Sequence, residues 1–385
     1  MTGIPNRLFF RLRIMRRLKT AVIGCGAISD IYLHNLTTRF GKTVEVTGCC
    51  AKSLEHARQK AEQYGITPLM LNEILEDDSI ELVVNLTPPE AHYDIIKKCL
   101  CANKHVYTEK TIASSWAQSR ELSNTAKRQG LYLASAPDTF LGEALQTARH
   151  ALDAGIIGQV TGFMANFNRD GSYFYERLAF TIRPEAGIGY DIGIYYITAL
   201  LSLLGSAAEV VGKTITSRPI RTRMLPKSGE IADTYTILNE NIMTAIVIMK
   251  NGAVGTLQFN GDTAFPSKKM LYVFGTKGIL QLPDPDMFGG PVYLLTGTGP
   301  GGAGNKKKLA GSGRYKNNSR GLGVADMAYA IITGRRPRAD TDIALHAIEM
   351  LDKITLSSNC GSKQFITTNM QRPVPMREQE PWMKE

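Results

Sequence analysis

A regular alternation of short apolar runs and helical segments between residues 19 and 137 most constrains the fold. Strands are expected at residues 20–23, 44–49, 81–86, 105–108 and 131–135, and helices at residues 30–40, 54–64, 92–102 and 114–129. Strands separated by helices of this length form βαβ units, which build a parallel sheet covered by helices. The first part of the chain is therefore predicted to be an α/β domain over residues 19–140.

The pattern changes after residue 140. Residues 160–168 alternate as a strand, and Asn251-Gly252 separates two alternating runs at 244–250 and 253–260, which is a strong hairpin signal. A second hairpin is expected over residues 269–282, and helices at 144–154, 323–332 and 341–357. Residues 141–385 are therefore predicted to form an α+β domain with a large, mostly antiparallel open sheet. The glycine-rich segment 289–313 is expected to be a surface loop, with a substrate lid as the alternative.

The net charge of +10 does not indicate a nucleic-acid surface, because six Lys and Arg residues and no acid lie in residues 1–20. Without these six charges the chain carries +4. Residues 1–18 are interpreted as a basic N-terminal tail without a function, with a targeting peptide as the alternative. No apolar run approaches the ~20 residues of a membrane span. The six cysteines form no CxxC pair, which argues against a zinc site and favours a reducing, cytoplasmic setting.

The sequence AVIGCGAIS, residues 21–29, follows the first strand and opens the first helix. Its pattern is G-x-G-x-x-S. Gly24 allows a tight turn, and Gly26 lets the backbone approach a pyrophosphate. Ala27 and Ile28 then begin the helix, whose N–H groups would face the phosphates. With a strand before it and a helix after it, this turn predicts a Rossmann dinucleotide-binding domain.

The end of the second strand bears on the choice of cofactor. An NAD-binding domain usually has an acidic residue there, for the ribose hydroxyls. In this chain Glu45 lies at the wrong end of the strand, and the tip carries Lys52 and Ser53. A cation and a hydroxyl suit a 2′-phosphate. NADP is therefore the favoured cofactor, and NAD is the alternative.

Further motifs follow in order: NLTPPEAH at residues 85–92, EKT at 109–111, APDTFLG at 136–142, GIGYDIGIYY at 187–196 and SRGLGVADMA at 319–328. Together with the glycine turn they resemble the Gfo/Idh/MocA oxidoreductases, the family of glucose-fructose oxidoreductase and inositol dehydrogenase. The resemblance covers nearly the whole chain. It implies hydride transfer between a nicotinamide cofactor and a sugar or cyclitol.

The resemblance also implies roles for single residues. The family motif E-K-P corresponds to Glu109, Lys110 and Thr111, so threonine replaces proline. The lysine would bind and polarise the reacting hydroxyl, and the glutamate would approach the nicotinamide ribose. The family motif D-x-G-x-H corresponds to residues 191–195, in which Asp191 is kept and Tyr195 replaces histidine.

Thr87, Pro88 and His92 follow the fourth strand of the expected sheet. Because ligands of open α/β sheets bind at the carboxyl ends of the strands, these residues are expected to contact the cofactor. His92 is predicted to lie near its nicotinamide half, with a structural histidine as the alternative.

Oxidation of a secondary alcohol needs a base within hydrogen-bond reach of the hydroxyl. Asp191 and Tyr195 are four residues apart and would share one face of a helix. A nearby Lys110 ammonium would favour the phenolate of Tyr195, whose reference pKa is about 10. Tyr195 is the first candidate for the acid–base residue. Lys110 is an equal alternative, and Asp191 would bind a neighbouring hydroxyl or orient Lys110.

These residues predict an NAD(P)-dependent dehydrogenase or reductase that acts on a sugar, glycoside or cyclitol, without a metal. The alternative is a sugar sensor that keeps the fold and has lost the chemistry. The resemblance also implies a homodimer or homotetramer formed through the second domain's sheet. Neither a nucleic acid nor a membrane is expected as a partner.

Overall fold

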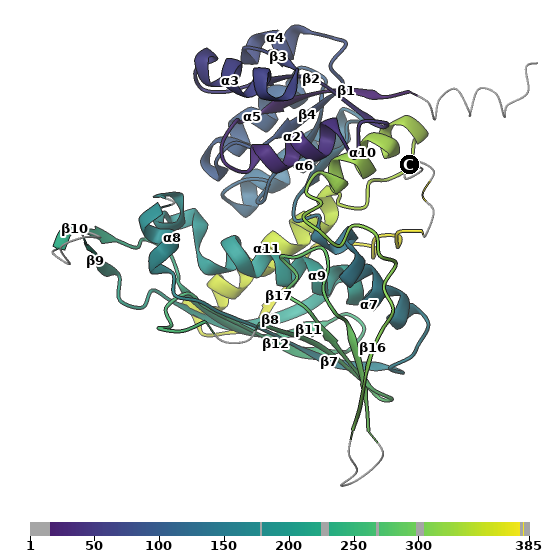
Figure 1. The fold of residues 1–385 in the computed structure, drawn as a ribbon. Helices are drawn as coiled ribbons and strands as arrows, with labels where there is room; N and C mark the ends of the chain where they lie inside the picture. Colours follow the sequence, from purple (N-terminus) through teal and green to yellow (C-terminus); the bar gives the residue numbers. More distant parts are fainter. Residues whose placement is uncertain are drawn as a thin grey trace, which may run out of the picture. The chain divides into compact units, whose positions relative to one another are not determined.

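The computed structural model describes residues 16–177, 179–224, 231–266, 269–297, 304–377 and 380 (Figure 1). The chain forms two compact units. The first comprises Met1–Gly142, Asn317–Leu345 and Pro373–Glu385, and the second comprises Glu143–Lys316 and His346–Arg372. The first boundary is close to the expected residue 140. The return of two C-terminal segments to the first unit differs from the expected division.

The first unit contains a six-stranded parallel sheet with the strand order β3-β2-β1-β4-β5-β6. Its strands are β1 (Leu18–Ile23), β2 (Val44–Cys50), β3 (Thr67–Pro68), β4 (Leu82–Asn85), β5 (His105–Thr108) and β6 (Leu133–Ser135). The order of the strands reverses between β1 and β4, where open α/β sheets bind their ligands. Nearly every residue of β1 and β4 is buried, which explains their continuous apolar runs.

Helices connect these strands: α2 (Ser29–Thr37), α3 (Leu54–Tyr64), α4 (Leu71–Glu76), α5 (Pro89–Cys101) and α6 (Trp116–Arg128). Local sequence fixes several of their ends. Ser53 and Ser115 cap α3 and α6 by accepting hydrogen bonds from backbone N–H groups, and Gly65 ends α3 in a left-handed conformation. The parallel sheet and its helices confirm the predicted Rossmann fold.

A late helix, α10 (Leu322–Thr333), belongs to this unit and contacts β2, β5 and β6. The Gly323 N–H donates to the buried Asp138 carboxylate at 2.8 Å, and the Asn35 side chain donates to the carbonyl of Arg320 at 2.8 Å. The expected assignment of this motif to the second domain is therefore wrong. Helix α10 is apolar around nearly its whole circumference, and packing against the sheet buries it.

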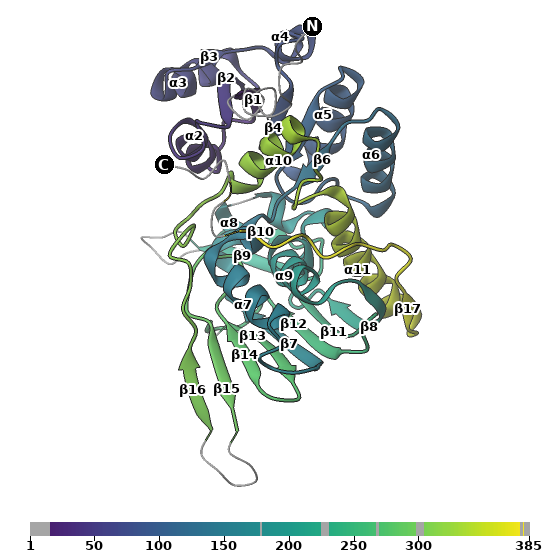
Figure 2. The same ribbon diagram turned by 90° about the vertical axis from the view of Figure 1, so that its right-hand side faces the viewer.

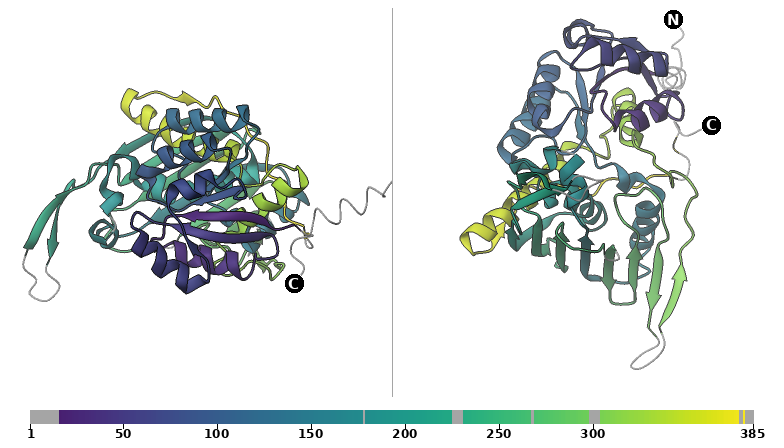
Figure 3. Two further views of the ribbon diagram at one scale, coloured as in Figure 1. Left: turned by 90° about the horizontal axis from the view of Figure 1, so that it is seen from above. Right: turned by 60° about the vertical axis from the view of Figure 1, so that its left-hand side comes forward.

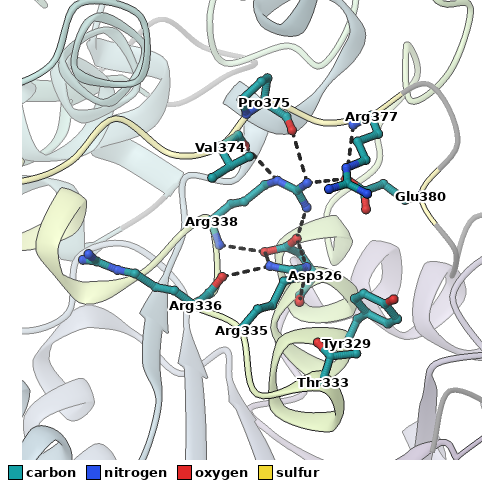
Figure 4. Close-up of polar contacts among 10 residues, drawn as sticks. All are labelled: Asp326, Tyr329, Thr333, Arg335, Arg336, Arg338, Val374, Pro375, Arg377 and Glu380. Carbon is teal, nitrogen blue, oxygen red and sulfur yellow. Dashed lines mark hydrogen bonds and ion pairs between the residues drawn. The ribbon is translucent and has the colours of Figure 1, made fainter. Parts of the chain in front are cut away.

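The segment after residue 373 is held to the first unit by buried charges (Figure 4). Arg338 donates to Asp326 Oδ1 at 2.6 Å, to the carbonyl of Val374 at 2.9 Å and to the Glu380 carboxylate. Asp326, Arg338 and Glu380 are 0%, 6% and 4% exposed. The arginine therefore links α10 to the C-terminal segment within the protein interior.

The expected basic tail at residues 1–18 falls mostly outside the described residues. Where the description begins, Arg16 pairs with Glu81, and Arg17 pairs with Glu45 at 3.2 Å. Leu18 already belongs to β1 and is fully buried. The last three residues of the expected tail are therefore part of the folded unit. None of the helices in the described part of the chain is long and apolar enough to cross a membrane.

The second unit contains a nine-stranded sheet with the order β16-β15-β14-β13-β7-β12-β11-β8-β17 (Figure 2). These strands are β7 (Val160–Asn168), β8 (Ala207–Ile215), β11 (Ile242–Met249), β12 (Val254–Asn260), β13 (Met270–Gly275), β14 (Ile279–Leu282), β15 (Tyr293–Thr296), β16 (Asn305–Lys308) and β17 (Gln364–Phe365). Neighbouring strands are antiparallel except for β7 and β12. Both expected hairpins are present, as β11–β12 and β13–β14.

The segment 289–313 differs from the expected loop, because β15 and β16 extend the sheet there. All four residues of the edge strand β16 are exposed, and three of them are lysines. A separate hairpin is formed by β9 (Ile220–Met224) and β10 (Ile231–Thr236), and it extends away from the sheet of its unit (Figures 1 and 3).

One face of the nine-stranded sheet is covered by α7 (Glu143–Asp153), α9 (Ile194–Leu204) and the second part of α11 (Thr341–Cys360). Met243, Ala245, Val247 and Met249 of β11 alternate toward this face and are buried. Gly212 of β8 leaves room for Ile354 of α11, whose side chain would lie 2.7 Å from an added Cβ. Two 3-10 turns, Ala179–Ile182 and Pro184–Ala186, follow the short helix α8 (Ser172–Arg177) and lead to a π-helical turn, Gly189–Gly193.

Candidate active site

The turn between β1 and α2 requires its first glycine. Gly24 has a φ of +105°, and a Cβ at this position would lie 2.6 Å from the backbone of Leu86 and 2.7 Å from that of Thr87. An L-residue rarely adopts this φ, and the backbone after β4 has no room to move away. Gly24 thus brings the turn against the end of β4, at the switch point of the sheet.

Gly26 has a different environment, because a Cβ at this position would meet no atom within 4 Å. Gly26 and Ala27 are exposed, and Ile28 precedes α2 without a side-chain hydrogen bond that would cap the helix. The N-terminus of a helix attracts anions through its free N–H groups and its dipole. Open space at Gly26 and an N-terminus without a side-chain cap fit a pyrophosphate.

The tip of β2 carries the two residues expected to select the cofactor. Lys52 is exposed, and its ammonium has no hydrogen-bond or ion-pair partner among the described residues. The Ser53 hydroxyl accepts a hydrogen bond from the His56 N–H at 3.3 Å. Ser53 therefore caps α3, a structural role that was not predicted, while Lys52 remains able to meet a phosphate.

The loop after β4 holds Thr87 and Pro88, and α5 begins directly after it. The Thr87 hydroxyl donates to Asn85 Oδ1 at 2.7 Å. His92 is fully buried, with Nδ1 2.6 Å from the carbonyl oxygen of Thr111 and Nε2 2.8 Å from that of Thr87. Burial lowers the pKa of its imidazole. Both ring nitrogens face backbone carbonyls, so His92 links the loops after β4 and β5 and is not available to a cofactor, contrary to the expected contact.

Glu109 and Lys110 follow β5 and are half-buried. The Tyr32 hydroxyl of α2 donates to Glu109 Oε1 at 2.7 Å, and the Lys110 N–H donates to Glu109 Oε2 at 3.1 Å. Burial, together with the nearby Glu109 carboxylate, raises the pKa of Tyr32 well above its usual range. The phenol therefore stays protonated and orients the carboxylate. Sequence reasoning missed Tyr32, because its partner is 77 residues away.

In the second unit Asp191 lies on the π-helical turn Gly189–Gly193. Arg169, which follows β7 directly, donates from Nη2 to Asp191 Oδ2 at 2.6 Å. Both side chains are nearly buried, at 10% and 12% exposure. Asp191 therefore forms a largely buried ion pair with Arg169 in addition to its place in the helical turn. Arg169 was not predicted, since nothing in its local sequence distinguishes it from a surface arginine.

The glycines near Asp191 allow close packing of neighbouring side chains against the backbone. A Cβ at Gly187 would overlap the carboxylate of Glu240, and a Cβ at Gly193 would lie 2.7 Å from the ring of Phe259. Burial raises the pKa of the Glu240 carboxyl to about 7. The backbone of this motif is therefore tightly packed at Gly187 and Gly193.

Tyr195 and Tyr196 begin α9 and differ in their surroundings. Tyr196 is fully buried, and its ring packs against Phe167 and Phe259 with centroid distances of 6.1 and 5.5 Å. It is a core residue whose hydroxyl lies 3.2 Å from Asp284 Oδ1. Tyr195 is 7% exposed, one position beyond the π-to-α junction, and follows Asp191 by about one helical turn. Asp191 and Tyr195 are thus adjacent parts of one helical segment.

Five of the predicted residues lie at the carboxyl edge of the parallel sheet: Gly24 and Gly26 after β1, Lys52 after β2, Thr87 after β4 and Glu109 after β5. Lys110 belongs to the same edge. In the second unit, the structure joins Asp191 to Arg169. Among the described residues no group of three or more His, Cys, Asp or Glu side chains could hold a metal ion.

Comparison with known proteins agrees with this geometry. Residues 18–136 match the model of an oxidoreductase family with an NAD-binding Rossmann fold, and residues 145–281 match a GFO/IDH/MocA C-terminal domain. An uncharacterised oxidoreductase of Schizosaccharomyces pombe is 31% identical over 215 residues, which are 54% of this chain and 57% of that protein. The chain thus aligns with little more than half the length of this relative.

Two further similarities cover more of the chain. The scyllo-inositol 2-dehydrogenase (NAD(+)) of Bacillus subtilis is 25% identical over 265 residues, 68% of this chain and 72% of that protein. A levoglucosan dehydrogenase structure with NADH and L-sorbose has a TM-score of 0.79 at 17% identity, covering 92% of this chain and 100% of that one. At this identity the structural likeness shows the fold. Both family models and the arrangement of the nucleotide-binding edge lead to one conclusion: the chain belongs to the Gfo/Idh/MocA family of oxidoreductases.

Proposed function

We propose that this protein transfers hydride between NAD(P) and a secondary hydroxyl or keto group of a sugar, glycoside or cyclitol. One observation carries the proposal: Gly26 borders open space directly before α2, a helix whose N-terminus has no side-chain cap. This opening lies at the same edge of the parallel sheet as Lys110. A nicotinamide cofactor bound there supplies the hydride acceptor or donor. The chain's own residues must bind the substrate and move its hydroxyl proton.

Lys110 would stabilise the alkoxide that develops as the hydroxyl loses its proton, because an ammonium interacts more strongly with an anion than with an alcohol. The Glu109 carboxylate accepts hydrogen bonds from the Tyr32 hydroxyl and from the Lys110 backbone N–H, and these bonds fix the backbone at Lys110. Asp191 would accept a hydrogen bond from a second hydroxyl of the substrate. Tyr195 would take up the proton, with Lys110 as the alternative base.

Replacing Lys110 tests the proposal. Lys110→Ala is expected to lower kcat by at least about 100-fold, as is typical of losing an acid–base or oxyanion-stabilising group, while cofactor affinity changes far less. Nicotinamide absorbance at 340 nm with a panel of sugars measures the rate. Turnover near that of the wild type would remove Lys110 from the mechanism. A wild-type protein that binds NAD(P) and turns over no sugar would favour the alternative, a sensor without catalysis.

The pH profile distinguishes the two candidate bases. If Tyr195 is the base, the rate of alcohol oxidation should keep rising above pH 8, because a phenol ionises near pH 10 in water. Tyr195→Phe should abolish this alkaline limb and keep the substrate KM within about tenfold, since only the hydroxyl is removed. Retention of both rate and profile by Tyr195→Phe would make Lys110 the base.

NADP is proposed as the preferred cofactor, supported by the exposed Lys52 and the lack of an acidic residue at the tip of β2. A homodimer or homotetramer is proposed to form through the uncovered face of the nine-stranded sheet. On that face Val211, Ile246 and Val254 are 46%, 51% and 48% exposed, and apolar sheet surface of this kind marks an interface. All six cysteines are free, which supports a reducing, cytoplasmic setting.

A further inference from the structure

We propose that Arg169 and Asp191 form a donor–acceptor pair that binds two neighbouring hydroxyls of an uncharged substrate. This inference rests on the proposed function and narrows its substrate class to neutral vicinal diols. It starts from a hydrogen bond that the arginine does not make. Arg169 is 8% exposed, and its Nε–H is buried without a hydrogen-bond partner among the described residues.

A buried donor without a partner is costly, because the group loses its water and gains nothing in return. Such groups in folded proteins are rare, and a bound water, an ion or a ligand can complete them. The neighbouring nitrogen of the same guanidinium, Nη2, is occupied by Asp191 at 2.6 Å. Nε–H and Nη2 lie along the same edge of the guanidinium, so the Nε–H without a partner among the described residues points to the same side as the bond to Asp191.

Two aromatic rings hold the guanidinium in place. Its central carbon lies 4.1 Å from the ring centroid of Phe174 and 5.8 Å from that of Phe167. Stacking on an aromatic face restricts the orientation of a guanidinium, and burial strengthens the attraction. The backbone at Arg169 is fixed as well, because its N–H donates to the carbonyl of Asn260 at 2.9 Å. The direction of the Nε–H bond is thus preorganised before any ligand binds.

Arginine only donates hydrogen bonds, whereas an ionised carboxylate only accepts them and offers about four lone-pair sites. Asp191 can therefore accept a substrate O–H while it remains paired with Arg169. Nε–H can donate to the oxygen of the adjacent hydroxyl. A hydroxyl both donates and accepts, so two hydroxyls on neighbouring carbons match this pair, whereas a lone hydroxyl satisfies only half of it.

The charge balance around the pair favours an uncharged substrate. Asp191 neutralises Arg169, and Asp262 pairs with Arg218 and, at 2.8 Å, with Arg221. Asp170 forms an isolated β-bridge with Asp262, and the hydrogen bond from Arg218 to Asp262, together with the Asp170 carboxylate, raises the pKa of Arg218. Each of the three arginines named here is thus paired with an aspartate carboxylate. A sugar carboxylate or phosphate would have to compete with these aspartates for the arginines.

The test combines enzyme variants with substrate analogues. Wild-type protein and Arg169→Lys are assayed with D-glucose, D-xylose and myo-inositol, and with deoxy analogues of each that lack one hydroxyl next to the oxidised carbon. Lysine keeps the charge that Asp191 needs but lacks the planar fork that can serve Asp191 and the substrate together. The wild type is expected to lose at least about tenfold in kcat/KM on removal of that hydroxyl, because the site is then left with an unpaired donor. In Arg169→Lys this discrimination should fall to about threefold or less.

Arg223→Lys is the matched control, because Arg223 forms a half-exposed ion pair with Asp233 on the β9–β10 hairpin. It should keep the wild-type discrimination. Arg169→Gln, with an amide that can still donate, provides a second variant should the lysine variant fail to fold. Undiminished discrimination in the folded Arg169 variant would overturn the proposal, as would preference for D-glucuronate over D-glucose. No turnover of any sugar by the wild type would instead contradict the proposed function itself.

Discussion

At the scale of single residues, Lys52 separates the two possible cofactors. Lys52→Ala should weaken NADP binding by about ten- to a hundredfold, the loss expected for a charge-assisted hydrogen bond to phosphate. NAD lacks the 2′-phosphate, so its affinity should barely change. Titration calorimetry with both cofactors measures the two constants. Lys98→Ala, at another exposed lysine of the same unit, is the control and should affect neither. Equal losses for NADP and NAD would contradict the assignment.

Glu240 makes stability depend on pH. Burial raises the pKa of its carboxyl to about 7, above the usual value of 4.5. Below pH 4.5 both the folded and the unfolded chain hold the proton, and the stabilising contribution is complete. As the pH rises to about 7 the unfolded chain releases its proton first, so this contribution is lost. The free energy of unfolding of Glu240→Gln, relative to that of the wild type, should therefore be roughly 2–3 kcal/mol larger at pH 8 than at pH 4. Urea unfolding at both pH values measures this difference. A difference independent of pH would refute this.

At the scale of elements, the β1–α2 turn uses its two glycines for different purposes. Gly24→Ala should lower the melting temperature, because the added Cβ meets the backbone after β4 at a φ of +105°. Gly26→Ala should melt as the wild type does without cofactor, since its Cβ enters open space. It should nevertheless bind cofactor at least about tenfold more weakly, because that space is where the pyrophosphate approaches. Equal stabilisation of Gly26→Ala and wild type by added cofactor would contradict this role.

The strands of the second unit illustrate which elements local sequence can predict. The β11–β12 hairpin was predicted because Asn251-Gly252 separates two alternating runs, and Gly252 has the required positive φ of +87°. Strands β15 and β16 were missed, because glycines and lysines surround them. They extend the β13–β14 hairpin as consecutive antiparallel strands, and neither shows the alternation that marks β11 and β12. Three lysines on β16 also protect the edge of the sheet from further pairing.

At the scale of the whole molecule, the C-terminal segment stabilises the unit that begins the chain. Arg338→Met would remove a buried ion pair from Glu380 and one of the two arginines that pair with Asp326. The expected loss is about 3–5 kcal/mol, the cost of breaking a buried pair. Lys97→Met is the control, because the side chains of Lys97 and its partner Glu121 are 49% and 47% exposed, and ion pairs on the surface contribute little to stability. Urea unfolding compares the two variants, and similar losses would refute the special role of Arg338.

The uncovered sheet face predicts the oligomeric state. Ile246→Lys introduces a charge where Ile246 and its cross-strand neighbour Val211 are both exposed. Burying this charge in an interface is costly, so the variant should be monomeric by light scattering after size-exclusion chromatography. Leu356→Lys, at an exposed leucine of α11, should keep the wild-type mass. An unchanged mass for Ile246→Lys would exclude this face as the interface.

The sequence by itself determined the features that depend on local periodicity and on short motifs. The parallel sheet, the glycine turn, the two β-hairpins and the positions of Lys110, Asp191 and Tyr195 all follow from residues a few positions apart. Tertiary structure decided what joins distant residues: α10 on the first sheet, Arg338 with Glu380, Tyr32 with Glu109, and Arg169 with Asp191. It also gave His92 a structural role, since two carbonyls from separate loops meet its ring. Such pairings join residues that are far apart in the sequence, and local periodicity does not indicate which distant segments come together.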